Sequence, residues 1–538
     1  MPPQPPSPEQ TPVLIIGGSL VGLSTAMFLA SAHSPTPIQP ILIERHSGHS
    51  LHPRAIGYTP RTMEIFGAAG IADQIPAAEK VFHEVRRARI ESLAGKWYEE
   101  TSWTPKEEGG EAEGGGEEFS PTKGAAVAQD VLEPILRRRA VELGASVRFG
   151  TKLLGFEQDG EGVMAKVVDA EGREYSIRAQ YMVAADGGRS QVREILGIQR
   201  TGRERLSVKR SVLFRADLQQ YLENGISQFT IDRLREFQNI FFTTYGDGRW
   251  VLMFDDEEED EDVNERELRK CIETAIGRSD IPIEIITTGR WEINGLVAEK
   301  FHIGRIFLAG DAAHSLPPSR GGYGVNTGIH DAHNLAWKLA SVISKVSRPA
   351  LLDTYDAERR PVALLRYQQH FARRDYADTD GKKSPILEDS AIELGQLYRS
   401  SAVLGVGDDL PVAQRPDYWK GQPGTRTPHL KITQNGQSTS SIDLFKFNWT
   451  LIAEDERWAA AAADVELAIR SKVAFVRVGQ DVEFSSRAAF HDAFGVGPSG
   501  ASLVRPDGYV AWRVSEAPES PTKELVGALR EVASSAKH

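Results

Sequence analysis

Three glycines and a serine near the start of the chain have the types and spacing of a turn that binds phosphate. They stand at Gly17, Gly18, Ser19 and Gly22. Glycine permits a turn so sharp that free backbone N–H groups and the start of a following helix face one point, where a pyrophosphate would sit. Ser19 departs from the usual G-x-G-x-x-G pattern. Taken alone, the motif is therefore equally well explained as a loop that its glycines merely shape.

Two aspartates much further along the chain follow apolar runs in the same way. Asp186 comes directly after residues 181–185, and Asp311 comes after residues 305–309 and Gly310. If both runs are parallel strands of one sheet, both loops reach the crevice at its carboxyl edge, where nucleotides bind. The alternative for each is a plain turn, because aspartate and glycine are common turn residues.

The elements that must position these residues are typical of a dinucleotide-binding fold. Residues 13–16 are four consecutive branched apolar residues, which suit a strand buried on both faces, and residues 23–30 continue as an apolar helix. The next strand, 41–43, ends in Glu44, where a ribose-binding carboxylate belongs. A membrane span or signal anchor over residues 13–30 is disfavoured, because three glycines interrupt it, no basic cluster precedes it and a strand follows at crossover spacing.

Composition limits the function classes. The chain has 538 residues, 40% of them hydrophobic and 26% charged, which predicts an ordinary globular protein of more than one domain. A net charge of −12 argues against a broad nucleic-acid surface. Cys271 is the only cysteine, so intrachain disulfides and CxxC redox pairs are excluded, and a cytoplasmic location is expected. Three nearby histidines lack the arrangement of a metal site, and we expect no metal: His314, His330 and His333.

The remaining segments predict further helices and strands. A helix follows Gln129, and another follows Gly324 with its N-terminus free to point a dipole at a bound group. Strands are predicted between residues 200 and 300 as an antiparallel layer, with a separate unit after residue 425. Residues 1–12 are expected to form a disordered tail, and residues 105–118 a solvated insertion of glycine and glutamate.

Together these motifs resemble the class A flavoprotein aromatic hydroxylases of the para-hydroxybenzoate hydroxylase fold. Residues 308–340 match this family best, and residues 501–513 resemble the C-terminal thioredoxin-like domain of its phenol and polyketide hydroxylase subset. The resemblance implies an α/β fold, in which a Rossmann-type FAD-binding domain carries an inserted antiparallel-sheet substrate domain and a thioredoxin-like domain. It implies the following ranges: tail 1–12; FAD-binding domain 13–85, 121–200 and 296–395 with connecting helices; substrate domain 86–120 and 201–295; thioredoxin-like domain 425–538.

The resemblance also implies roles for particular residues. Gly17, Gly18, Ser19 and Gly22 would line the FAD pyrophosphate, and Glu44, followed by Arg45, would bind the adenosine ribose. The other implied FAD contacts are Arg54, Gln129, Asp186, Gly310, Asp311, Gly324, Val325 and Asn326. Asp186 would also support the transient NADPH, and the backbone of residues 324–326 would face the flavin pyrimidine edge. Arg215 and Tyr245 are weak candidates for activating a phenol, since most such side chains are structural.

The chemistry that the resemblance implies is aromatic hydroxylation in secondary metabolism. NADPH would reduce FAD, O2 would form a flavin C4a-hydroperoxide, and one oxygen would pass to a phenolic or polycyclic, polyketide-like ring. Two alternatives stay open: a Baeyer–Villiger or ring-opening oxygenase, and a catalytically silent FAD-binding protein. The expected partners are the small aromatic substrate and O2, with no nucleic acid and no membrane span. The single cysteine leaves the C-terminal domain a packing role or a homodimer contact.

Overall fold

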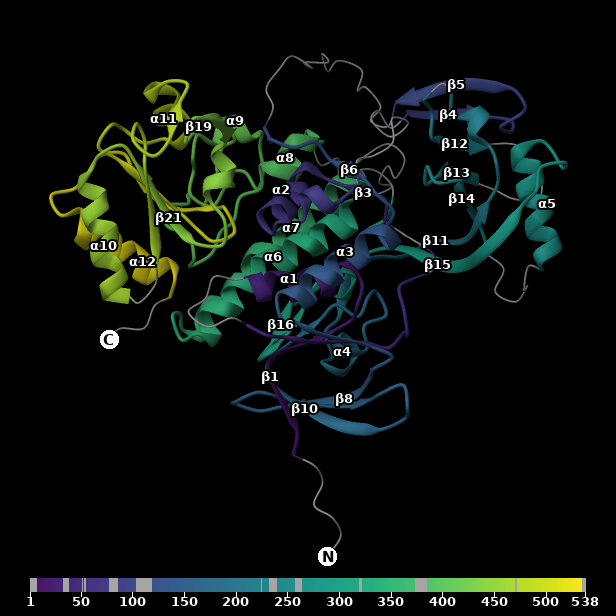
Figure 1. Cartoon of the computed structure of the whole chain (residues 1–538), viewed down its shortest axis with the longest axis horizontal. Coiled ribbons are helices and arrows are strands. Elements are labelled where there is room, and N and C mark those ends of the chain that lie inside the picture. The colour runs from purple at the N-terminus through teal and green to yellow at the C-terminus, as the bar shows by residue number, and fades with distance from the viewer. Residues whose placement is uncertain are drawn as a thin grey trace, which may run out of the picture.

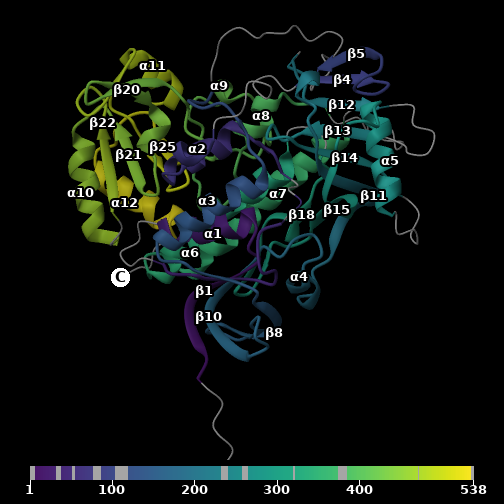
Figure 2. The same ribbon diagram turned by 45° about the vertical axis from the view of Figure 1, so that its right-hand side comes forward.

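The fold is taken from a computed structural model, which describes residues 7–31, 38–50, 52, 55–76, 86–102, 119–223, 225–231, 240–256, 264–318, 322–372, 385–469 and 472–534. Figure 1 shows three parts side by side: a central part, a part on the right, and the yellow-green C-terminal part on the left. The central part separates the other two in this view and in the turned view of Figure 2.

A mostly parallel sheet forms the base of the central part. Its strands run in the order β16 (His302–Ile303), β17 (Ile306–Leu308), β10 (Glu174–Ala184), β1 (Glu9–Ile16), β2 (Ile41–Glu44) and β7 (Ser146–Phe149). Every neighbouring pair from β17 to β7 is parallel, as buried runs of branched apolar residues predict. The hairpin of β8 (Lys152–Gln158) and β9 (Val163–Val168) extends the sheet from β10.

Three helices cover this sheet and bury its apolar residues. They are α1 (Leu20–Ser31), α3 (Gln129–Glu142) and α6 (Tyr323–Ile343), and α1 packs against both of the others. The helix α7 (Thr354–Phe371) lies on α6, and α2 (Pro60–Ala68) packs near the start of α6. This is the Rossmann-type arrangement that the first strand, turn and helix predict.

The right-hand part is built on a second eight-stranded sheet. The order is β18 (His314–Ser315), β15 (Glu284–Ala298), β11 (Arg200–Arg215), β14 (Arg249–Asp255), β13 (Ile240–Thr244), β12 (Gln228–Ile231), β4 (Arg86–Ile90) and β5 (Trp97–Ser102). All pairs are antiparallel except β12 with β4. The helix α5 (Glu265–Ile276) covers one face, where Phe214, Phe242, Trp250 and Cys271 are part of one apolar core.

The C-terminal part carries a four-stranded sheet in the order β22 (Val473–Arg477), β21 (Trp449–Ala453), β24 (Ala501–Val504) and β25 (Val510–Val514). The pair β21 and β22 is parallel, and the other two pairs are antiparallel. The helices α10 (Arg457–Ile469) and α12 (Pro521–Val532) pack together beside it. This order and these directions confirm the thioredoxin-like fold that the sequence predicts.

The other elements are short. They are β3 (Gly57–Tyr58), β6 (Ala125–Ala126), α4 (Gln191–Ile195), α8 (Asp389–Leu394), α9 (Pro416–Trp419), β19 (Lys431–Gln434), β20 (Gln437–Ser440), β23 (Glu483–Phe484), α11 (Arg487–Phe494), and 3-10 turns at Ala72–Gln74, Gln219–Tyr221, Gly310–Ala312 (η4), Pro349–Asp353 and Ser441–Leu444.

A buried ionic cluster joins the C-terminal part to the central helices. Glu358 of α7 accepts from both terminal nitrogens of Arg505, at 2.6 and 2.8 Å, and from Lys338 Nζ of α6 at 2.7 Å. Asp507 accepts from Arg505 Nε at 3.0 Å. Burial opposes the charged form of Glu358, but Arg505 and Lys338 hold the pKa of this carboxyl well below its usual range. These ion pairs hold the C-terminal part against the central part, because a buried charge that loses its partner is strongly destabilising.

The N-terminal tail is shorter than the sequence predicts. The prediction of disorder over residues 1–12 is wrong at its end, because β1 begins at Glu9, which pairs with Ile177 and forms an ion pair with Arg148 at 2.6 Å. The predicted insertion over residues 105–118 lies outside the described residues. Among the helices that are described, none is long and apolar enough to span a bilayer.

Candidate functional site

The parallel strands of the central sheet end at one edge, and the loops that follow them meet there. The N–H of Ala185 donates to the carbonyl of Ile16 at 2.8 Å, and the N–H of Ala309 donates to the carbonyl of Ala184 at 2.9 Å. The ends of β1, β10 and β17 are therefore held side by side. The three sequence motifs, far apart along the chain, therefore lie at one edge of the sheet, and the space beside this edge is called the crevice below.

The first of these loops has no room for side chains at two of its glycines. A Cβ on Gly22 would overlap the carbonyl oxygen of Gly17, and a Cβ on Gly17 would overlap that of Ala185. Gly17 also has a φ of 110°, which favours glycine. Since α1 begins three residues later, its unbonded N–H groups face the crevice. This cradle fits a dinucleotide pyrophosphate.

Ser19 is exposed at the crevice and belongs to a hydrogen-bonded group that the sequence reasoning missed. Its hydroxyl donates to Glu133 Oε1 at 2.6 Å and accepts from Gln129 Nε2 at 3.0 Å. Glu133 is 1% exposed, and its other oxygen lies 3.1 Å from His49 Nδ1. Gln129 and Glu133 stand four residues apart on α3 and so share one face, which is the signal that could have identified Glu133.

Glu44 stands at the end of β2, as predicted. Its two carboxylate oxygens accept from the N–H groups of Gly18 at 2.7 Å and His46 at 2.9 Å. Gly18 allows this close approach, because a Cβ there would press on the Glu44 side chain. Arg45 is exposed to solvent and donates to His46 at 3.2 Å. Glu44 therefore lies at the turn, where a ribose would follow the pyrophosphate, whereas the contact seen for Arg45 is with a surface histidine.

Asp186 lies just after the end of β10 with a carboxylate that is only partly satisfied. Its Oδ2 accepts from the N–H of Val192 at 3.2 Å, and its buried Oδ1 has no hydrogen-bond partner among the described residues. Burial raises the pKa of Asp186 above its ordinary value. This buried oxygen at the sheet edge is suited to receive a hydroxyl of a bound ligand.

Asp311 is exposed in η4, before the start of α6. The turn that carries it is held in place by buried side chains. The N–H of Gly310 donates to Asp331 Oδ2 at 3.2 Å, and the same carboxylate holds His314 at 2.6 Å and Arg359 at 2.8 Å. Asp331 is fully buried and was missed by the sequence reasoning. This ion cluster sets the position of the loop that presents Asp311.

The start of α6 is pinned by the side chain of Asn326. Its Oδ1 accepts from the N–H of Thr59 at 3.0 Å and from the Thr62 hydroxyl at 2.6 Å, and its Nδ2 donates to the carbonyl of Gly322 at 2.8 Å. The first-turn N–H groups, which include those of residues 324 and 325, have no partner within the helix. The predicted residues 324–326 therefore offer a positive backbone end, and the Asn326 side chain has a structural role. Arg54 lies outside the described residues.

One face of the second sheet packs against α5, and the other turns toward the central part. Phe214 and Leu252 point toward α5, so the alternating residues lie on the opposite face. That face is mixed, with the apolar Leu213, Val251 and Met253 beside the polar Ser211 and Arg249. That face turns toward the central part, because Arg249 of β14 binds Asp130 at the start of α3 at 2.5 Å. This side of the sheet is called the substrate face below, because it turns toward the loops at the edge of the central sheet.

The structure places the two weak catalytic candidates differently. The guanidinium carbon of Arg249 lies 5.4 Å from the ring centre of Tyr245. Because Arg249 also binds Asp130, Tyr245 stands beside the start of α3, next to Gln129. Burial raises the pKa of the Tyr245 hydroxyl, so this group stays protonated at neutral pH. Arg215 has a side chain that is 56% exposed, and it lies 3.6 Å from Glu284. Tyr245 is thus brought to the site, and Arg215 to its solvent rim.

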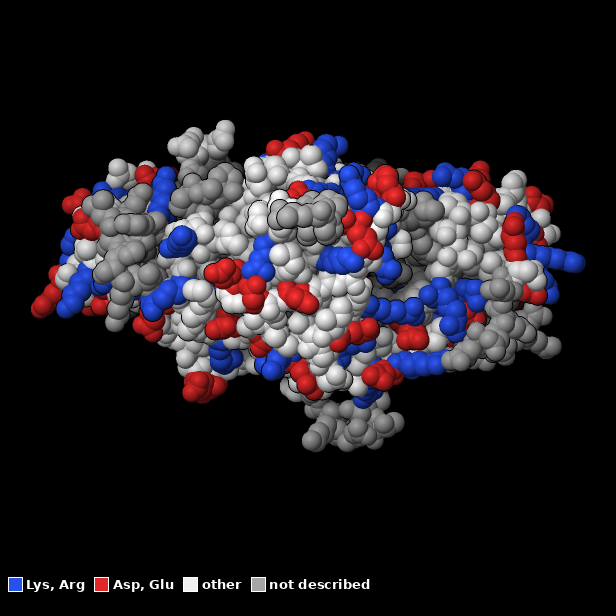
Figure 3. Space-filling model, turned by 90° about the horizontal axis from the view of Figure 1, so that it is seen from below, with Lys and Arg blue, Asp and Glu red and all other residues white. Residues whose placement is uncertain are grey.

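Positive side chains gather at one place on the face that Figure 3 shows. In the view of Figure 3, Lys and Arg border a hollow between the central and right-hand parts, whereas both signs are interspersed over most of the remaining face. A phosphorylated co-substrate that approaches this side meets favourable charge.

Comparison with known proteins agrees with this geometry. A family model described as "FAD binding domain" matches residues 10–369, and one described as "Aromatic-ring hydroxylase, C-terminal" matches residues 420–536. The chain is 39% identical to 4-methyl-5-nitrocatechol 5-monooxygenase of a Burkholderia species, with 97% of each covered. It is 37% identical to aklavinone 12-hydroxylase of Streptomyces purpurascens, with 97% of this chain and 99% of the relative covered. The crystal structure of aklavinone-11 hydroxylase with FAD and aklavinone superposes with a TM-score of 0.86 at 35% identity, over 98% of this chain and 100% of the other.

Proposed function

Because this chain belongs to the family of FAD-dependent aromatic-ring hydroxylases, we propose that the crevice holds FAD and that the substrate face of the second sheet holds a phenol for hydroxylation. The enzyme is an NADPH-consuming monooxygenase of aromatic compounds. The observation that supports this placement of the site is that three strand-end loops meet at one edge of the central sheet, opposite one face of a separate sheet.

The proposal gives each described residue a role toward FAD. The turn from Gly17 to Gly22 binds the pyrophosphate, and Glu44 binds the adenosine ribose. Gln129 lies along the flavin side, Asp186 supports FAD and NADPH, and the Gly310–Asp311 loop contacts the ribityl region. The first turn of α6 faces the flavin pyrimidine edge. Its helix dipole favours negative charge there.

Bound FAD would supply the redox chemistry, by accepting a hydride from NADPH and passing one oxygen atom of O2 to the ring. The chain itself has three tasks. The apolar strands of the sheet and the buried face of α3 exclude water from the reacting atoms. Gln129 and the Ser19–Glu133 pair hold the cofactor in place. Tyr245, whose hydroxyl is protonated at neutral pH, can donate a hydrogen bond to the substrate oxygen.

Two substrate classes have support from relatives. Aklavinone and tetracenomycin are polycyclic, and the names of several relatives carry them. The name of the nitrocatechol relative instead carries a single ring. We propose a polycyclic, polyketide-like phenol, because the superposition at a TM-score of 0.86 is with a complex that contains aklavinone. The proposal also places the enzyme in the cytoplasm and gives the C-terminal domain a packing role, which the buried Arg505–Glu358 pair supports.

The test is a screen of NADPH oxidation by the FAD-loaded protein against aromatic polyketides and catechols. The expected result is faster NADPH oxidation with at least one polycyclic phenol and a product that is heavier by one oxygen, with its ring intact in the NMR spectrum. A ring-expanded or ring-opened product would instead support a Baeyer–Villiger reaction. Flavin binding without reduction by NADPH would support a silent FAD-binding protein.

A further inference from the structure

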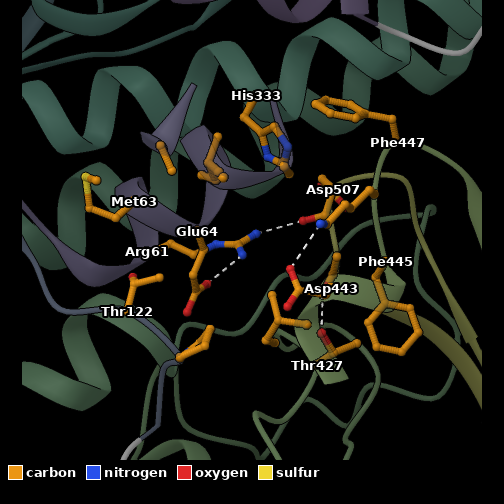
Figure 4. A pocket seen from close by; sticks show the side chains of 18 of the residues that line it. Arg61, Met63, Glu64, Thr122, His333, Thr427, Asp443, Phe445, Phe447 and Asp507 are labelled. Carbon is orange, nitrogen blue, oxygen red and sulfur yellow. Dashed lines mark hydrogen bonds and ion pairs between the residues drawn. The ribbon is translucent and has the colours of Figure 1, made fainter. Parts of the chain in front are cut away.

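A pocket of about 260 Å³ lies between α2 and the C-terminal domain (Figure 4). From α2 its wall includes Met63 and Gly67, and from the C-terminal domain it includes Phe445 and Phe447. Of the residues assigned above to FAD or to the substrate, none of those that the structure describes lines it. The pocket is therefore a second concave site, separate from the crevice.

The charged side chains in its wall are already paired with one another. Arg61 donates to Glu64 at 2.9 Å and to the backbone carbonyl of Asp507 at 2.8 Å, and Glu64 also binds Arg426 at 2.9 Å. Elsewhere in the wall, Lys446 lies 3.0 Å from Asp443. A charged ligand would have to break one of these pairs, so the wall favours an uncharged occupant.

His333 is the polar group left over in this wall. It is 8% exposed, and its ring packs edge-on against Phe28 and Phe447, at 5.2 and 6.0 Å. Its ring nitrogens make no hydrogen bond to any described residue, and Figure 4 shows the ring directed into the pocket. A neutral imidazole carries one donor and one acceptor, which a ligand in the pocket can use.

We propose that this pocket binds a small, uncharged aromatic alcohol, whose hydroxyl is held by His333 and whose ring lies against Met63, Phe445 and Phe447. Pockets for drug-sized ligands measure roughly 300–1,000 Å³, so this one takes one or two fused rings. Its occupant would contact both α6 and α2, and α2 holds the Asn326 side chain through Thr59 and Thr62.

Methionine methyl signals can follow this binding directly in the FAD-loaded full chain. The chain has six methionines, of which Met63 lines the pocket and Met253 lies on the substrate face of the second sheet. When the methionine methyl groups are labelled with ¹³C, added 2-naphthol should shift the NMR signal of Met63 until the binding site is saturated. The Met63 signal is identified by its loss in Met63→Leu. Any shift of the Met253 signal reports separately on binding at the substrate face.

A matched pair of glycine substitutions locates the binding. Gly67 and Gly527 both lie in helices, and nothing stands within 4 Å of a Cβ at either position. Gly67→Leu fills the pocket and should abolish the shift of the Met63 signal. Gly527→Leu, on the exposed side of α12, should leave that shift unchanged.

The chemical class is tested by the ligand and by His333. His333→Phe keeps the ring contacts but removes the hydrogen bond, and should weaken 2-naphthol binding by about tenfold. The anion 2-naphthoate should bind at least tenfold more weakly than 2-naphthol, because Arg61 and Lys446, the cations among the described wall residues, are already paired.

Three results would overturn the proposal. An unmoved Met63 signal up to the solubility limit of 2-naphthol would mean that the pocket holds only water. Equal binding of 2-naphthol by the wild type and His333→Phe would show that the imidazole does not hold the hydroxyl. An unchanged shift in Gly67→Leu would place the ligand somewhere other than this pocket.

Discussion

The side chains at the crevice differ in how well the sequence around each of them predicts its position in the fold. Asp186 and Asp311 closely follow buried strands, so their placement at the sheet edge could be predicted. For Glu133 the one local signal is its four-residue spacing from Gln129, because its partner Ser19 lies more than a hundred residues away. Asp331, which binds Arg359 of a separate helix, has no such signal. Contacts of this kind depend on how helices pack, which a local pattern does not contain.

The carboxylate of Asp311 gives the first prediction at this scale. Because Asp311 is exposed and its loop is held by Asp331, Asp311→Ala should fold normally. It should lose one or two hydrogen bonds to FAD and weaken FAD binding by roughly 10- to 100-fold. Fluorescence titration of the flavin-free protein with FAD measures this. Asp408→Ala, at another exposed aspartate, is the control, and equal affinities in the two variants would reject the role of Asp311.

His333 gives a prediction on pH. Burial, with nearby Arg61, lowers the pKa of His333 from 6.5 to about 3, so the folded chain keeps it neutral while the unfolded chain takes up a proton below pH 6.5. The contribution of this shift to the free energy of unfolding is fully present above pH 6.5, and it is lost as the pH falls from 6.5 toward 3. Between pH 7 and pH 5 the loss should be roughly 2 kcal/mol.

Chemical denaturation of the wild type and His333→Phe at both pH values measures that loss. The free energy of unfolding should fall less steeply with acid in His333→Phe. Parallel losses in the two proteins would show that His333 is not held neutral by the fold. His330, whose pKa burial also lowers, remains in both proteins and so cancels in the difference.

At the scale of elements, the strands of the parallel sheet were the easiest to predict. β1, β10 and β17 each end in an apolar run that a glycine or an aspartate follows within two residues, and β2 begins at the predicted residue 41. The second sheet was harder, since β4 and β5 come from residues 86–102 and β4 pairs with a strand more than a hundred residues away. The parallel pairing of β4 with β12 within a predicted antiparallel layer had no local signal.

The turn between β1 and α1 carries the prediction at this scale. Gly22→Ala places a methyl group against the Gly17 carbonyl, so the turn must open and the N–H groups no longer converge. We expect FAD affinity to fall by roughly 100-fold or more with the secondary structure retained, as measured by flavin titration and circular dichroism. Gly48→Ala, where nothing lies within 4 Å of the new methyl, should bind FAD like the wild type. Normal FAD binding by Gly22→Ala would contradict the proposed cradle.

At the scale of the whole molecule, the C-terminal domain is an integral part of the fold. Its thioredoxin-like shape has no cysteine for thiol exchange, and a buried ion-pair junction joins it to the central helices. Arg505, which follows β24, reaches into the helices α6 and α7, where Glu358 and Lys338 are fully buried. This junction could not be predicted from local patterns, because Arg505 and Glu358 are 147 positions apart in the sequence.

Loss of this junction should therefore destabilise the entire chain. Arg505→Met leaves the Glu358 carboxylate with Lys338 as its remaining cation, and removal of one partner from a buried pair costs about 3–5 kcal/mol. Thermal and denaturant unfolding should show a lower midpoint for the whole protein. Arg530→Met, on the exposed side of α12, is the control. An unchanged midpoint in Arg505→Met, or normal FAD content after deletion of residues 425–538, would show that the domain is dispensable.

The loops at one sheet edge are proposed to hold a flavin beside a substrate face, so that one oxygen atom of O2 enters an aromatic ring. The most direct test is turnover of the FAD-loaded enzyme under ¹⁸O2 with NADPH and the best phenol of the screen, followed by mass spectrometry of the product. We predict one ¹⁸O atom per product molecule and one NADPH consumed for each. A product without ¹⁸O, formed at the same rate, would contradict the account.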